Sequence, residues 1–150
     1  MISVSGVRGV YGDGLDEGIA ERFAYAFGRR RGGAVVIGRD SRVSGEVIAG
    51  AVASGLRKAG VDVIDLGLAS TPTTEMAVIA RKAAGGVIVT ASHNPAEWNG
   101  LKFLGPDGVF ISPEEGERLV EGFRAAGETE LPRPEGDIAT WDRADDHHID

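Results

Sequence analysis

The chain has 150 residues, 42% of them hydrophobic, which suits one domain with a buried core. Its formal charge is −7, and residues 128–150 hold eight acidic side chains against two arginines, so the remaining body is nearly neutral. A nearly neutral body without a basic stripe argues against nucleic acid as a partner. The absence of cysteine excludes disulfides and thiolate metal sites, and no apolar run approaches 18 residues, so we expect a cytoplasmic protein without a membrane partner.

The first predicted helix covers residues 19–30. Apolar side chains recur there at helical spacing, and three arginines, Arg29 to Arg31, follow just before a pair of glycines. Cations in the last turn of a helix offset its negative end. We therefore interpret these arginines as structural, with ligand binding as the alternative.

Two strands and a helix come next. The apolar run 34–37 has glycines before and after it, which is typical of a buried strand. Ser44 is a good N-cap for a helix whose apolar side chains recur until Gly60 ends it. Residues 61–66 then predict a second strand.

A third helix and a third strand complete the alternation. Thr71 and Pro72 are expected to cap and open the helix. Its shared apolar face is expected to consist of Met76, Ile79, Ala80 and Ala83. Residues 87–89 predict the strand. The order strand, helix, strand, helix, strand indicates an α/β fold, with three α/β/α layers and a mostly parallel (mixed) sheet.

The last regular elements are a hairpin and a helix. Residues 101–104 and 109–111 flank the turn sequence GPDG and predict the two strands of the hairpin. Ser112 with Pro113 is expected to start a helix that runs to about Ala126.

The chain beyond this helix is rich in proline, glycine and acidic residues. Such a composition predicts an exposed segment, although Ile138 and Trp141 are able to pack back on the body. We therefore expect one domain at 1–126 and an acidic connector at 127–150.

Polar residues follow the third predicted strand. The segment TASHNP, at 90–95, begins where that strand ends, and open α/β sheets bind ligands outside the carboxyl ends of their strands. Two interpretations of Ser92, His93 and Asn94 remain open from the residues alone. They are turn residues that end a strand, or they are reactive side chains displayed on a loop.

The segments TASHNP, at 90–95, and WNGLK, at 98–102, resemble the phosphoserine loop of the α-D-phosphohexomutases. SGVRG at 5–9, GRDSRVSG at 38–45 and TPTTE at 71–75 resemble other parts of the first domain of that family, in the same order. The resemblance implies a magnesium-dependent enzyme that interconverts hexose 6-phosphate and hexose 1-phosphate through a bisphosphate. Residues 2–4 depart from it, because the family more often has Phe-Gly-Thr there.

The resemblance also implies roles for five residues. Ser92 would carry the phosphoryl group and, once phosphorylated, bind Mg²⁺ together with acidic residues of a later domain. Arg8 would bind phosphate through its planar guanidinium group. His93 and Asn94 would position the transferring group, and His93 could also shuttle a proton. Lys102 would assist proton transfer or hold phosphate, with a solvated strand lysine as the alternative.

Three loops of the family are absent from these 150 residues: the Asp-Gly-Asp-x-Asp-Arg metal loop, the sugar-selecting loop and the C-terminal phosphate-binding loop. We therefore expect a first domain that is inactive alone and works with the remaining domains on a hexose phosphate and its bisphosphate. Glucosamine or mannose phosphate is the favoured substrate, and glucose phosphate stays open. The alternative function is a non-catalytic phosphoacceptor or docking module.

Two further groups of polar residues receive other interpretations. Arg39, Asp40 and Arg42 follow the first strand, where an aspartate between arginines often forms a structural ion pair at a helix start. The adjacent Ser92 and His93 could suggest a serine hydrolase, but adjacent side chains rarely face each other. The glycines of a nucleophile elbow are also absent, so a hydrolase is disfavoured.

Overall fold

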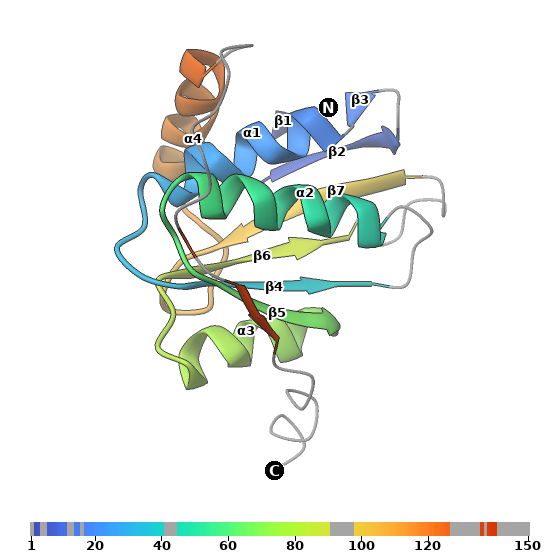
Figure 1. Ribbon diagram of the computed structural model, residues 1–150. Coiled ribbons are helices and arrows are strands. Elements are labelled where there is room, and N and C mark those ends of the chain that lie inside the picture. The colour runs from blue at the N-terminus through green and yellow to red at the C-terminus, as the bar shows by residue number, and fades with distance from the viewer. Residues whose placement is uncertain are drawn as a thin grey trace.

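The structure, a computed structural model, describes residues 2–3, 6–11, 14–15, 17–40, 45–90, 98–126, 136 and 138–140. These residues form one mixed sheet with helices on both faces (Figure 1). The helices are α1 (Glu17–Gly28), α2 (Gly45–Lys58), α3 (Thr71–Ala80) and α4 (Pro113–Ala126). The strands are β1 (Ile2–Ser3), β2 (Gly6–Tyr11), β3 (Gly14–Leu15), β4 (Val35–Arg39), β5 (Val63–Leu68), β6 (Gly85–Val89), β7 (Trp98–Leu104) and β8 (Ile138–Thr140).

The strands lie in the order β1-β2-β7-β6-β4-β5-β8, and β3 pairs with β2. Strands β6, β4, β5 and β8 pair in parallel, whereas β7 runs antiparallel to both of its neighbours, β6 and β2. The connection from β4 to β5 passes through α2, and the connection from β5 to β6 passes through α3. The predicted three-layer α/β/α fold with a mostly parallel, mixed sheet is therefore confirmed.

The larger core lies between the sheet and helices α1, α2 and α4, and the smaller core lies under α3 on the opposite face (Figure 1). Phe27 of α1 contacts Phe103 of β7, with ring centroids 4.9 Å apart. Phe23 of α1 stacks on Phe123 of α4, with centroids 3.9 Å apart. Aromatic side chains remove large apolar surfaces from water, so these contacts attach α1 to both the sheet and α4.

Helices α1 and α2 approach each other closely at Gly55. A Cβ atom at this position would collide with the backbone carbonyl oxygen of Glu21. The carboxylate of Glu21 accepts hydrogen bonds from Ser54, at 2.5 Å, and from Lys58, at 2.9 Å. Burial alone would raise the pKa of Glu21, but the bonds from these two partners outweigh it and lower the pKa. The two helices are thus joined by backbone contact and by an ion pair.

Helix α3 differs from the prediction in its cap and in its buried face. The N-cap is Ser70 rather than Thr71, because the Ser70 hydroxyl accepts a hydrogen bond from the Thr73 N–H at 3.1 Å. The buried residues of the helix are Thr73, Thr74, Ala77 and Val78. Of the predicted face, Ala83 is buried, but the exposed residues are Met76, Ile79 and Ala80.

The reason for this difference is local hydrogen bonding. Ser70 donates its hydroxyl proton to Oγ1 of Thr73 at 2.8 Å, and Thr74 donates its own to the Ser70 carbonyl at 2.9 Å. Both threonine hydroxyls therefore have partners, so this face of the helix can be buried without an unsatisfied polar group. The helix is turned away from the face that apolar spacing alone selects.

The predicted hairpin forms only in part. Strand β7 is one side of it, but residues 109–111 form no strand and contribute a single bridge, from Phe110 to Leu104. The Asp107 carboxylate accepts a hydrogen bond from the Val109 N–H at 3.1 Å. This side-chain bond extends the turn into the predicted second strand, which explains why the prediction fails there.

Other boundaries agree with the sequence where the structure describes them. The Ser112 hydroxyl accepts a hydrogen bond from the Glu115 N–H at 3.2 Å and so caps α4 as predicted.

Strand β8 lies within the predicted connector, residues 127–150, and pairs in parallel with β5 at the edge of the sheet. Ser44 and Trp141 lie outside the described residues. Within the described ranges, no helix combines the length and apolarity that crossing a membrane requires.

Replacement of Gly55 tests the close packing of α1 on α2. We expect Gly55→Ala to lower the free energy of unfolding by about 1–3 kcal/mol, because the new methyl group meets the α1 backbone. Gly50→Ala is the matched control, since Gly50 is exposed on the same helix and has open space around it. It should raise the free energy of unfolding by about 0.5–1 kcal/mol through helix propensity. Urea unfolding measures both, and equal stability of the two variants would contradict the packing.

Candidate functional site

The candidate site lies where the carboxyl ends of β4 and β6 meet. From β4 the chain passes through α2 to β5 on one side, and from β5 it returns through α3 to β6 on the other side of β4. After β6 it continues to β7, away from β4. The carboxyl ends of both strands point to the right-hand side of Figure 1. Such a switch point is where open α/β sheets bind their ligands.

Hydrogen bonds join the strand ends at this point. Thr90, the first residue after β6, donates its hydroxyl proton to Oδ2 of Asp40, the first residue after β4, at 2.7 Å. The Asp40 N–H donates to the Val89 carbonyl at 3.1 Å, and the Ala69 N–H donates to the Arg39 carbonyl at 3.0 Å. The carboxyl ends of β6, β4 and β5 are therefore fixed relative to one another.

Asp40 was predicted to form an ion pair with its flanking arginines, whereas its carboxylate contacts a partner that the sequence did not reveal. Its carboxylate binds Thr90 across the sheet, while Arg39 donates from Nη1 to the backbone carbonyl of Asp40 at 3.4 Å. Arg42 lies outside the described residues. The one signal for Thr90 in the sequence is that it is the first polar residue after the buried apolar run 87–89.

Helix α3 packs directly against β4 beside this edge. A Cβ atom at Gly38 would collide with the hydroxyl oxygen of Thr74. The segments GRDSRVSG and TPTTE, which lie far apart in the sequence, therefore meet in the fold. Close packing explains Gly38 of the first segment and Thr74 of the second, because a larger residue at position 38 would push α3 away from the strand.

The register of the sheet brings Arg8 level with Thr90. Leu101 of β7 pairs with Val7 of β2 on one side and with Val89 of β6 on the other. The next residues, Arg8 and Thr90, therefore lie at the same height, two strands apart. Neighbouring strands are about 4.8 Å apart, so the two Cα atoms are about 10 Å apart. The side chain of Arg8 lies outside the described part of the chain.

Lys102 lies on the face of β7 that is turned toward α3. Its two neighbours in sequence are buried in the larger core on the other face, as predicted. The Lys102 ammonium group is 5.6 Å from the centroid of the Phe110 ring, a cation–π contact. Phe110 forms a bridge with Leu104, which pairs with Gly86 near the start of β6. This contact draws the ammonium group away from the strand end at Thr90.

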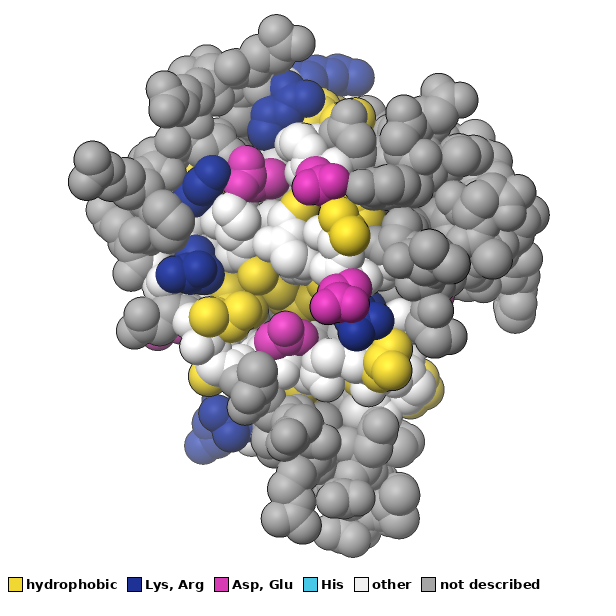
Figure 2. Space-filling view, turned by 45° about the vertical axis from the view of Figure 1, so that its right-hand side comes forward, with side chains coloured by type: hydrophobic (Ala, Val, Ile, Leu, Met, Phe, Trp, Pro, Cys, Tyr) yellow, Lys and Arg dark blue, Asp and Glu magenta, His cyan; other side chains and the backbone are white. Residues whose placement is uncertain are grey.

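The described structure thus brings two of the predicted site residues, Arg8 and Lys102, onto adjacent strands. Ser92, His93 and Asn94 lie outside the described residues, between β6 and β7. Among the residues that are described, no three His, Cys, Asp or Glu side chains form a group that could hold a metal. Figure 2 turns this edge toward the viewer and shows acidic and basic side chains interspersed on it, without a field of one sign.

Residues 2–130 match the family described as phosphoglucomutase/phosphomannomutase, alpha/beta/alpha domain I. The chain is 44% identical over 127 residues to a phosphoglucomutase/phosphomannomutase of Thermococcus kodakarensis, covering 81% of this chain and 28% of that protein. It is 41% identical over 145 residues to a phosphoglucosamine mutase of Oceanobacillus iheyensis, covering 91% of this chain and 31% of that protein.

Solved structures give the same result. A crystal structure of a phosphoglucomutase/phosphomannomutase family protein from Burkholderia thailandensis has a TM-score of 0.83 at 33% identity. The match covers 98% of this chain and 35% of that one. The chain therefore spans about a third of the length of the proteins that it matches.

The bond between Thr90 and Asp40 can be tested by stability measurements. Thr90→Val keeps the shape of a side chain that is 8% exposed but removes the donor. We expect it to lower the free energy of unfolding by about 1–2 kcal/mol, because the Asp40 oxygen loses its partner. Thr90→Ser keeps the hydroxyl and should retain most of that energy. Urea unfolding compares them, and a valine variant as stable as the unchanged chain would show that the bond contributes nothing.

Proposed function

The chain belongs to the phosphoglucomutase/phosphomannomutase family as an α/β/α domain I, and we propose that it is the phosphoserine-bearing part of a hexose phosphate mutase. One observation carries the proposal: the segment TASHNP begins at Thr90, on the fixed strand ends at the switch point of the sheet. A loop that starts from a rigid strand end beside a crevice is suited to present reactive side chains.

Ser92 is the proposed phosphoryl carrier. It follows Thr90 by two residues, so covalent geometry keeps its Cα within about 7 Å of the Thr90 Cα. Phosphorylated Ser92 would transfer its phosphoryl group to the free hydroxyl of a hexose monophosphate, which yields the bisphosphate and unmodified Ser92. The proton lost by the sugar hydroxyl would return to the serine oxygen through a neighbouring base. After the bisphosphate turns around, its other phosphoryl group would move back to Ser92.

The remaining predicted residues have roles that fit this transfer. Arg8, level with Thr90 in the sheet, would bind a phosphate group through two parallel hydrogen bonds. His93 and Asn94 would hydrogen-bond the transferring group, and His93 could move the proton. Lys102 would hold phosphate or assist the proton transfer, but for this its ammonium group has to leave the Phe110 ring.

Mg²⁺ is the proposed cofactor, held by the phosphate oxygens of phosphorylated Ser92, which are hard donors of the kind this ion prefers. The described part of the chain offers no cluster of three metal-binding side chains, so further ligands would be acidic residues of another domain. Bound Mg²⁺ would neutralise charge that develops on the transferring group.

Glucosamine phosphate and mannose phosphate are the proposed substrates. A relative named phosphoglucosamine mutase is 41% identical to this chain, and one named phosphoglucomutase/phosphomannomutase is 44% identical. The two identities are too close to favour one sugar. The side chains that distinguish these sugars are expected outside domain I. Assays of the full-length protein with each sugar phosphate would separate the two substrates.

A phosphoacceptor or docking module is the second candidate function. In that case Ser92 would accept a phosphoryl group without completing an isomerisation. Both candidate functions predict that the 150-residue chain alone shows no useful mutase turnover.

A chimera tests the role of Ser92. The matching third of the Oceanobacillus iheyensis phosphoglucosamine mutase is replaced by this chain, and glucosamine phosphate isomerisation is measured. We expect activity in the chimera and a loss of at least about 10³-fold on Ser92→Ala, because the nucleophile is removed. Peptide mapping after incubation with a hexose bisphosphate should place the added phosphate on Ser92.

Ser112→Ala in the same chimera is the matched control, since Ser112 caps α4 and should affect stability but not turnover. Phosphate on another residue, or full activity of the Ser92→Ala chimera, would overturn the mechanism. Phosphorylation of Ser92 without isomerisation would instead favour the phosphoacceptor module.

A further inference from the structure

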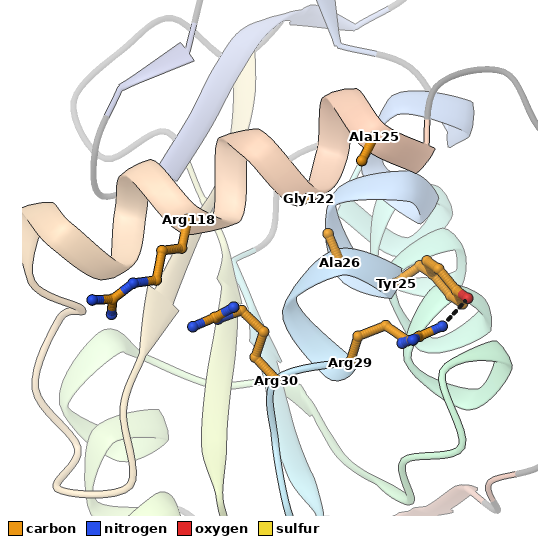
Figure 3. Close-up of a pocket in the computed structure, with 7 residues that line it drawn as sticks. All are labelled: Tyr25, Ala26, Arg29, Arg30, Arg118, Gly122 and Ala125. Carbon is orange, nitrogen blue, oxygen red and sulfur yellow. Dashed lines mark hydrogen bonds between the residues drawn. The ribbon is translucent and has the colours of Figure 1, made fainter.

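A pocket of about 480 Å³ lies between the end of α1 and helix α4 (Figure 3). The residues that line it are Tyr25, Ala26, Arg29, Arg30, Arg118, Gly122 and Ala125. Its volume falls within the range of about 300–1,000 Å³ that is usual for small-molecule sites. The pocket is formed by residues far apart in the sequence, so the fold itself creates it.

Small side chains make the pocket possible. A Cβ atom at Gly122 would stand 3.3 Å from the Cβ of Ala26, which shows how closely α4 approaches α1 there. Ala26, Gly122 and Ala125 leave room that longer side chains would fill. The Tyr25 ring adds an apolar wall. A ligand would therefore find a shallow apolar floor between two helices.

Three guanidinium groups surround this floor, although the whole chain carries a net charge of −7. Arg29 donates from Nη1 to the Tyr25 hydroxyl at 2.9 Å, so its guanidinium group is turned toward the Tyr25 end of the pocket (Figure 3). Arg30, in the turn after α1, and Arg118, in α4, extend toward the same side of the pocket (Figure 3). No carboxylate lines it, and in the described part of the chain neither Arg30 nor Arg118 forms an ion pair.

Glutamates lie one turn before and one turn after Arg118 on α4, but they are not part of the pocket lining. Glu114 and Glu121 precede and follow Arg118 on α4 by four and three residues, yet neither lines the pocket. Glu115 is engaged by Arg31, whose guanidinium group also lies over the Phe27 ring. The side chains that line the pocket therefore include three cations and no carboxylate.

Stabilisation of the end of α1 explains only part of this arrangement. Arg31 has a structural role, but a different one from the predicted compensation of the helix end, since it binds Glu115 of α4. Arg29 and Arg30 also follow the last turn of α1 and offset its negative end. Arg118 lies in the interior of α4, where the helix dipole gives no reason for a cation. The third cation of the pocket therefore needs another explanation.

We propose that this pocket binds a small metabolite that carries a phosphate group and a second anionic group. Guanidinium groups hold phosphate and carboxylate oxygens through paired hydrogen bonds and stay charged throughout the physiological pH range. Arg30, from the turn after α1, and Arg118, from α4, would each bind one anionic group, and the apolar floor would contact the carbon skeleton that joins them.

The site is distinct from the crevice at Thr90. Helix α1 ends at Gly28, and the chain then enters β4 at its amino end, whereas Thr90 and Asp40 lie beyond the carboxyl ends of β6 and β4. The two sites are therefore at opposite ends of the sheet. The proposal does not depend on the proposed function, because it uses none of the residues assigned to phosphoryl transfer.

Amide chemical shifts of the ¹⁵N-labelled chain test the proposal in 150 mM NaCl, with 3-phosphoglycerate as the probe. We expect saturable shifts at Arg30, Arg118 and Gly122, with a dissociation constant below about 1 mM. Inorganic phosphate should bind the same residues about 10-fold more weakly, because it offers one anionic group. Equal affinity for both probes would overturn the claim of a second anionic group.

Two variants of equal net charge distinguish binding at a local site from general electrostatic attraction of an anion to the chain. Arg118→Gln should weaken 3-phosphoglycerate binding at least about 10-fold, and Arg124→Gln, on the same helix but outside the pocket, by less than about 2-fold. Arg118 is exposed, so both variants should keep dispersed native spectra. Equal weakening in the two variants, or shifts confined to residues around Thr90, would refute the site.

The acidic residues 128–150 are the competing occupant, because they hold eight acidic side chains against two arginines. A synthetic peptide of this sequence is added to the labelled chain in the same experiment. Absence of shifts in the pocket supports the metabolite site. Binding of the peptide there with higher affinity than 3-phosphoglycerate would overturn it in favour of an acidic peptide.

Discussion

The hydrogen bond from Thr90 to Asp40 is the contact on which the geometry of the candidate site depends. Strands β4 and β6 pair in parallel up to Arg39 and Val89, and at the next residue the side chains continue the connection. Backbone pairing alone would stop at the strand ends, where the chain begins to diverge. Because the bond lies there, the segment after Thr90 starts from a fixed point beside the switch in strand order.

Close backbone packing on both faces of the sheet supports this fixed point. On one face, Gly38 of β4 leaves no space between the strand and Thr74 of α3. On the other, Gly55 of α2 meets the backbone of α1 at Glu21. A side chain at Gly38 would push α3 away from the sheet, and one at Gly55 would push α1 and α2 apart within the helix layer on the other face.

The sequence predicted those features that depend on local pattern. Apolar runs next to glycines predicted β4 and β6, and Ser112 predicted the start of α4. The prediction of which face of α3 is buried was wrong, because hydrogen bonds with Ser70 allow two threonines to be buried in place of Met76 and Ile79. The Thr90 partner could not be predicted, because Asp40 is 50 residues away in the sequence and becomes a neighbour only through strand order.

The arginines after α1 show the same limit of local pattern, and their positions bear on how the two sites relate. Local pattern treated Arg29, Arg30 and Arg31 as one group, yet tertiary contacts divide them between Glu115 and the pocket. The pocket is built on α1, which is held to the sheet by Phe27 against Phe103 and to α2 at Gly55. Coupling between the pocket and the crevice would require an element with two discrete arrangements. The dense packing of α1 favours a single arrangement of this helix. Binding of a ligand in the pocket should therefore leave the strand ends at Thr90 unchanged.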